Sequence, residues 1–159
     1  MPHEIGHAEL VRRRLVRDGA VEIPSSGISM FPLIRTGDMC RFVPVGGKVL
    51  KPGAVLLFAD REGRLIGHRL IRVEKGHAGT RYILKGDANL LPDEAVEPDR
   101  LLGVLETITR RAKDGKPHTA NANSLPRKWW GFAVRHVPGV SHVLRRLASV
   151  SSASSVLPA

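Results

Sequence analysis

The fold is decided by the stretch Arg64-Leu65-Ile66-Gly67-His68-Arg69-Leu70-Ile71-Arg72-Val73. Leu, Ile and Val fill five of its ten positions, and this enrichment is typical of a β-strand. The preceding residues 60–63 have the composition of a turn. We therefore expect a strand at this place, with a histidine inside it.

Further short segments have the same composition and are bounded by Gly, Pro or Asp. With the first, the expected strands are Val21–Ile23, Met39–Val43, Ala54–Phe58, Leu65–Val73, Arg81–Leu84 and Leu101–Thr109. No segment of helical length separates them, so we expect a mainly β, antiparallel domain. A short helix from His3 to Arg17 should precede it and end at Gly19, because glycine suits a helix C-cap.

Length and composition are typical of a small folded protein. A chain of 159 residues with 42% hydrophobic residues can form one domain with appended ends. The single cysteine, Cys40, excludes an intramolecular disulfide, and its place in a strand favours a packing role. No run approaches ~18 apolar residues and no signal peptide opens the chain, so we expect a cytoplasmic protein without a transmembrane helix.

Three residues could together carry out acyl transfer. Ser29 supplies a hydroxyl nucleophile, His68 an imidazole base and Asp93 a carboxylate that orients the imidazole. An imidazole, with an ordinary pKa near ~6.5, can act as a base at neutral pH. Each residue also has a structural interpretation: a serine in a Gly/Ser turn, an exposed polar strand position, and an aspartate that caps a turn.

The residues around these three resemble the S24/S26 serine peptidase superfamily, which holds type I signal peptidases and LexA-type self-cleaving repressors. The resemblance spans residues 21–110. The first box of the superfamily pairs Ser-Met with a nearby Pro and Gly-Asp, and the matching positions are Ser29, Met30, Pro32, Gly37 and Asp38. It implies a coiled antiparallel β fold, peptide-bond hydrolysis without a cofactor or metal, and polypeptide substrates with small residues before the cut.

The same resemblance assigns the base and the acid. Most bacterial members use a lysine, whereas His68, followed by Arg69, is similar to the archaeal and endoplasmic-reticulum branch. That branch has two aspartates six residues apart, here Asp87 and Asp93. Asp93 is then the triad acid, and Asp87 a structural carboxylate.

Two features depart from the family pattern. Gly27 stands where many signal peptidases have a hydroxyl residue in the oxyanion hole, so backbone N–H groups near Ser29 must take that role. A run of arginines, residues 12–14, stands where those enzymes have a membrane anchor. We therefore expect a peptidase that acts on cytoplasmic peptides or on itself.

The chain divides by composition into four segments. We expect an N-terminal helix over 1–20, the β domain over 21–110, a polar linker over 111–126, and a basic amphipathic tail over 127–159 whose end, from Ser149, is disordered. In the tail, Trp129 and Trp130 next to cations, with Arg145 and Arg146 further on, suggest peripheral membrane contact. The alternative, a helix packed on the core or a partner, is favoured.

Other functions fit less well. The +10 formal charge could attract nucleic acid, but no recognition motif accompanies it, and about twenty residues before Val21 leave no room for a DNA-binding domain. The His3–His7 segment matches the zinc motif H-E-x-x-H, yet it lies at the N-terminus and contains Gly6, so we expect no metal. The small residues of Ala120-Asn121-Ala122 could form a site for self-cleavage after Ala122, but an ordinary linker explains them better.

The sequence thus predicts a serine endopeptidase that uses Ser29, His68 and Asp93. Gly27, Met30, Pro32, Asp38, Asp87 and Arg69 are expected to support these three. A non-catalytic peptide-binding or scaffold module on the same fold, tethered by its C-terminal tail, is the alternative.

Overall fold

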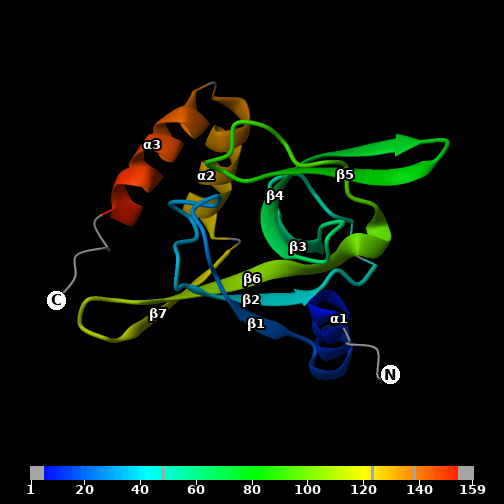
Figure 1. Cartoon of the computed structure of the whole chain (residues 1–159), viewed down its shortest axis with the longest axis horizontal. Helices are drawn as coiled ribbons and strands as arrows, with labels where there is room; N and C mark the ends of the chain where they lie inside the picture. The colour runs from blue at the N-terminus through cyan, green and yellow to red at the C-terminus, as the bar shows by residue number, and fades with distance from the viewer. Residues whose placement is uncertain (1–5, 48, 123, 138, 154–159) are drawn as a thin grey trace.

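The structure, a computed structural model, describes residues 6–47, 49–122, 124–137 and 139–153. Within them the strands are β1 (Val21–Pro24), β2 (Met39–Pro44), β3 (Val55–Ala59), β4 (Leu65–Gly76), β5 (Gly79–Lys85), β6 (Leu101–Arg111) and β7 (Pro117–Asn121). They form one sheet in the order β1-β2-β6-β3-β4-β5, and β7 pairs with the end of β6 (Figure 1). Every pairing is antiparallel, so the expected mainly β, antiparallel fold is confirmed.

The centre of the sheet is β3, which is buried along its whole length. Its alternate side chains enter two different cores, because successive residues of a strand face opposite sides of the sheet. Leu56 and Phe58 pack in one core with Leu70 and Leu84 of β4 and β5. Val55, Leu57 and Ala59 pack in the other, which contains Phe42 of β2 and Leu105 of β6. Both faces of this strand are therefore covered, and β4, its neighbour, is fixed at the middle of the molecule.

The first helix, α1 (His7–Asp18), closes one core. Val11 and Leu15 lie one turn apart and bury their side chains against the sheet. The helix ends as expected at Gly19, which has φ 72° and donates its N–H to the Leu15 carbonyl at 3.1 Å. The beginning of the expected helix, at His3, lies outside the described residues.

The predicted linker over 111–126 is wrong. β6 continues to Arg111, a turn follows, and β7 returns alongside β6 with Thr107 opposite Asn121. The side chains of β7 are mostly exposed, so this hairpin depends on backbone hydrogen bonds and shows no hydrophobic alternation. The helix α2 (Leu125–His136) then begins within the predicted linker.

The C-terminal part of the chain forms two helices, α2 and α3 (Val140–Ala153). The prediction of disorder from Ser149 is wrong as far as Ala153, because α3 runs to that residue; residues 154–159 lie outside the described part. Val134 of α2 and Leu144 of α3 are buried against Ala88, with Trp130 and Val140 beside them. The helix pair is therefore packed on the loop that follows β5.

Candidate active site

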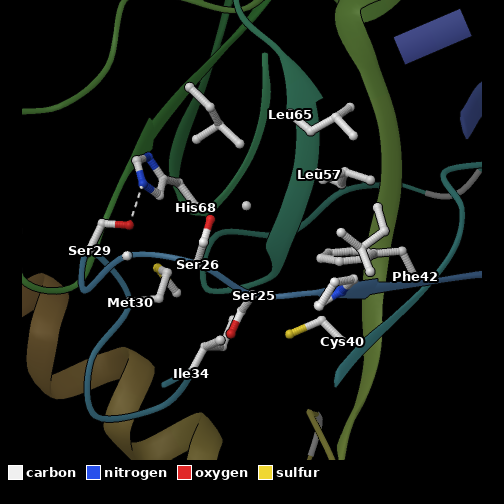
Figure 2. Close-up of a pocket in the computed structure, with 15 residues that line it drawn as sticks. Ser25, Ser26, Ser29, Met30, Ile34, Cys40, Phe42, Leu57, Leu65 and His68 are labelled. Carbon is white, nitrogen blue, oxygen red and sulfur yellow. Dashed lines mark hydrogen bonds between the residues drawn. The ribbon is translucent and has the colours of Figure 1, made fainter. Parts of the chain in front are cut away.

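Three separate elements bring Ser29, His68 and Asp93 into contact. Ser29 lies in the loop between β1 and β2, His68 in β4, and Asp93 in the loop after β5. The Nε2 atom of His68 is 3.0 Å from the Ser29 hydroxyl, and its Nδ1 atom is 2.7 Å from an Asp93 carboxylate oxygen. Figure 2 shows the first of these contacts at the edge of a pocket. The first distance suits proton transfer from a hydroxyl to an imidazole, and the second suits a carboxylate that orients the imidazole ring.

The position of each member has a local cause. His68 pairs in the sheet with Leu56, and its ring meets the edge of the Phe58 ring at a centroid distance of 6.2 Å. Asp93 is held by its own N–H, which donates to the Leu84 carbonyl at the end of β5. The His68 side chain is 8% exposed and that of Asp93 21%, so the imidazole is largely shielded from water while the carboxylate is partly exposed.

The Ser29 loop is closed at its base by Asp38. This buried carboxylate accepts two hydrogen bonds from the Arg110 guanidinium, at 2.8 and 2.5 Å, and one from the Arg35 N–H. The hydrogen bond to Asp38 raises the pKa of Arg110. Gly27 and Gly37 have φ of 83° and 87°, which residues with a side chain rarely adopt. The geometry therefore gives Asp38 and Gly27 structural tasks in shaping this loop.

The two other residues of the first box lie within the same loop. Met30 is buried in the core that lies under the loop. Pro32 follows a cis peptide bond from Phe31.

Residues 86–89 support the backbone of Ser29 directly. The Ala88 N–H donates to the Ser29 carbonyl at 2.8 Å. A Cβ atom added at Gly86 would lie 2.8 Å from that same carbonyl oxygen. Only glycine therefore allows the loop to approach the Ser29 backbone this closely.

We expect Gly86→Ala to lower kcat by about 100-fold, because a shift of about 1 Å in a reacting group can have an effect of this size. Steady-state kinetics on a cleaved peptide measures the change. Gly76→Ala is the matched control, since nothing lies within 4 Å of a Cβ added there. Equal activity of Gly86→Ala and Gly76→Ala would contradict this role of Gly86.

A buried ion pair connects the strand that carries His68 to this loop. Arg69, next to His68, donates from Nε and Nη2 to the two carboxylate oxygens of Asp87 at 2.7 and 2.6 Å. The two residues are 3% and 0% exposed. Arg69 also donates to the Gly53 carbonyl at 2.8 Å. The structural role expected for Asp87 and Arg69 agrees with these contacts.

Nothing in the local sequence indicates that α2 contacts this pair. The Trp130 indole N–H donates to Asp87 at 3.1 Å, and a Cβ added at Gly131 would lie 2.8 Å from Arg69 Nη1. Trp130 thus uses its polar atom inside the protein, as the packed-helix alternative expected. Arg145 and Arg146 are exposed on α3. The side chain of Trp129 lies outside the described residues.

A pocket of about 290 Å³ extends from Ser29 and His68 toward the core (Figure 2). Its walls are mostly apolar. They include Met30, Ile34, Cys40, Phe42, Leu57 and Leu65. A pocket with such walls can hold an apolar side chain.

Backbone groups are available for an oxyanion. Within the described residues, the Ser29 N–H donates to no protein acceptor. Gly27, two residues earlier, offers no hydroxyl. The Ser29 N–H is therefore a candidate donor to negative charge on a carbonyl oxygen bound at this place.

The Cys40 thiol in the pocket wall is 2% exposed. Burial, and next the charge of Asp38, raises its pKa from 9.0 to about 11. In the unfolded chain this thiol ionises from about pH 9, whereas in the folded chain it ionises only near pH 11. The stability that the neutral thiol contributes to the folded state is therefore fully present below pH 9. It is lost as the pH rises from 9 to 11.

We expect the free energy of unfolding to fall by about 2 kcal/mol between pH 8 and 11 through this group alone. Urea denaturation of the wild type and of Cys40→Ala at both pH values isolates it, because every other titrating group is shared. The same pH dependence in both proteins would contradict a raised thiol pKa.

Other predicted features lie apart from this site. Of the zinc motif, His3 and Glu4 lie outside the described residues, and His7 is exposed at the start of α1. The described residues contain no cluster of three or more His, Cys, Asp or Glu that could hold a metal. Ala120 and Asn121 belong to β7, and the Ala122 N–H donates to Glu106, so self-cleavage after Ala122 would require this pairing to break.

No described helix is both long and apolar enough to cross a bilayer. No protein-family model matches the chain. No curated protein sequence matches it significantly.

Proposed function

We propose that this protein is a serine endopeptidase related to the signal peptidases. The observation that supports this most strongly is the unbroken hydrogen-bond chain from Ser29 through His68 to Asp93. The three residues come from elements far apart in the sequence. A structural serine in a turn would not need a buried histidine with a carboxylate behind it.

The proposed reaction follows the usual course of acyl transfer. The Ser29 oxygen attacks the peptide carbonyl while His68 Nε2 takes the hydroxyl proton, and Asp93 stabilises the imidazolium. The Ser29 N–H donates to the oxyanion. His68 then protonates the leaving amine, and an acyl-enzyme ester forms on Ser29. A water molecule, deprotonated by His68, hydrolyses the ester and restores the serine.

The substrate is an unfolded or extended polypeptide. Its side chain before the cut would enter the pocket lined by Met30 and Phe42, which suits small or apolar residues. The buried, reduced Cys40 is compatible with work in a reducing compartment such as the cytoplasm.

A mixed peptide library, incubated with wild type and with Ser29→Ala and examined by mass spectrometry for new termini, tests the proposal. We expect new termini with wild type alone, with small or apolar residues before each cut. If neither protein cleaves while both retain the same peptides, the chain is instead a peptide-binding module on this fold.

A further inference from the structure

A second cavity lies between α2 and the sheet, separate from the pocket at Ser29. It has a volume of about 430 Å³, which is in the range of pockets that hold small molecules. Within the described part of the chain, the two cavities share no lining residue. The walls of the second one include the turn before β3, parts of β3 and β6, and Phe132 and Arg135 of α2. The proposed peptidase reaction has no use for this cavity.

The polar part of its wall is positively charged. Two guanidinium groups meet at Gly53: Arg69 donates to the Gly53 carbonyl at 2.8 Å, and Arg135 Nη1 lies 2.9 Å from the place of a Cβ atom there. Lys51 also lines the cavity. Asp87 neutralises Arg69, but no carboxylate of the described residues pairs with Arg135 or Lys51. Two positive charges at this wall are therefore uncompensated, and a cleft lined by one sign of charge attracts ions of the other.

Most of the remaining wall is apolar. Leu33, Val55 and Leu105 contribute to it from the sheet side, and Phe132 contributes from α2. Phe132 is 52% exposed, so a ligand in the cavity could cover apolar surface that now faces water. The cavity thus offers an apolar surface next to unpaired cations.

We propose that this cavity binds a small carboxylate that carries an aliphatic chain. The chain covers the apolar wall, and the carboxylate accepts hydrogen bonds from Arg135 and Lys51. A peptide fits less well, because the Gly53 N–H already donates to the Leu70 carbonyl and the Ala54 N–H to the Lys51 carbonyl. The amide groups of a bound peptide would lose water without gaining these partners.

The test is isothermal titration calorimetry of the full chain with octanoate, octanol, octylammonium and acetate. We expect octanoate to bind, and to bind more weakly as salt is added. The other three should bind at least about tenfold more weakly, because each lacks the charge, its sign or the chain. Octanoate should bind Ser29→Ala like the wild type, so the result does not depend on the proposed peptidase function.

Variants of the wall locate the bound octanoate. Arg135→Gln should weaken its binding by about tenfold, the usual worth of a hydrogen bond to a charged group. Lys51→Gln and Phe132→Ser should weaken it as well. The matched controls are Lys113→Gln, at an exposed cation near the β6–β7 turn, and Val16→Ser, at an 82% exposed valine of α1. Both controls should bind octanoate like the wild type, and circular dichroism should show every variant folded.

Three results would overturn the proposal. The first is equal binding of octanoate and octanol, and the second is wild-type affinity for octanoate in Arg135→Gln. The third concerns an acetylated Ala-Val-Leu tripeptide, whose binding at the candidate active site should not change in Arg135→Gln. If the tripeptide loses affinity in that variant while octanoate does not bind at all, the cavity is a peptide site instead.

Discussion

Ser29→Ala and His68→Ala are each expected to lower kcat by about 10⁴-fold or more, and the double variant is expected to lose no more than either single one. The reason is that the hydroxyl and the imidazole, 3.0 Å apart, act as one unit. The imidazole acts by taking the proton of the hydroxyl, so removing it after the hydroxyl is gone costs no further rate. Rates on one cleaved peptide for the four proteins measure this directly.

The control for this series is Ser26→Ala, which changes another serine of the pocket wall; among the described residues, the hydrogen bonds of the His68 ring go to Ser29 and Asp93 and not to Ser26. It should keep most of the activity. Losses that multiply in the double variant would show that Ser29 and His68 act independently, which would contradict the triad.

The second large effect concerns stability. Asp87→Ala would leave the Arg69 guanidinium, 3% exposed, without its carboxylate. Breaking a buried pair from one side costs about 3–5 kcal/mol, so we expect the free energy of unfolding to fall by that amount in urea denaturation. Activity should fall as well, because the loop that follows Asp87 carries both Ala88 and Asp93.

The control is Glu94→Ala, which breaks an ion pair with Arg61 in which both side chains are exposed, at 66% and 69%. That change should cost less than about 1 kcal/mol. Replacing both partners, as Arg69→Met with Asp87→Leu, should recover stability lost in Asp87→Ala, since apolar groups need no partner. If Asp87→Ala and Glu94→Ala destabilise the protein equally, burial does not make the pair of Arg69 and Asp87 more important for stability than an exposed one.

The strands that are buried could be predicted from the sequence, because burial requires apolar residues. Leu65–Val73 and Ala54–Phe58 are apolar because β3 and β4 lie in the middle of two cores, and composition reveals this. β7 was missed because Pro117–Asn121 is mostly exposed on both faces, so its pairing with β6 left no hydrophobic pattern.

The candidate site was predicted in part. Short sequence motifs identified Ser29, His68 and Asp93 as candidate catalytic residues. Only the fold could bring them together, since the contacts join residues 25 and 39 positions apart. The contact of Trp130 with Asp87 spans 43 positions. The aromatic and basic residues next to Trp130 suggested contact with a membrane surface. Nothing in the local sequence could show that the indole N–H instead donates to a buried carboxylate.

The most direct test of the triad is to capture the acyl group on the protein. A short peptide ending in alanine as an activated ester, mixed with the enzyme and quenched in acid, should leave its acyl group on Ser29, located by peptide mapping. We predict this adduct and ester turnover in wild type, and neither in Ser29→Ala. Ester hydrolysis at the same rate in Ser29→Ala, or an acyl group only on another residue, would contradict the account.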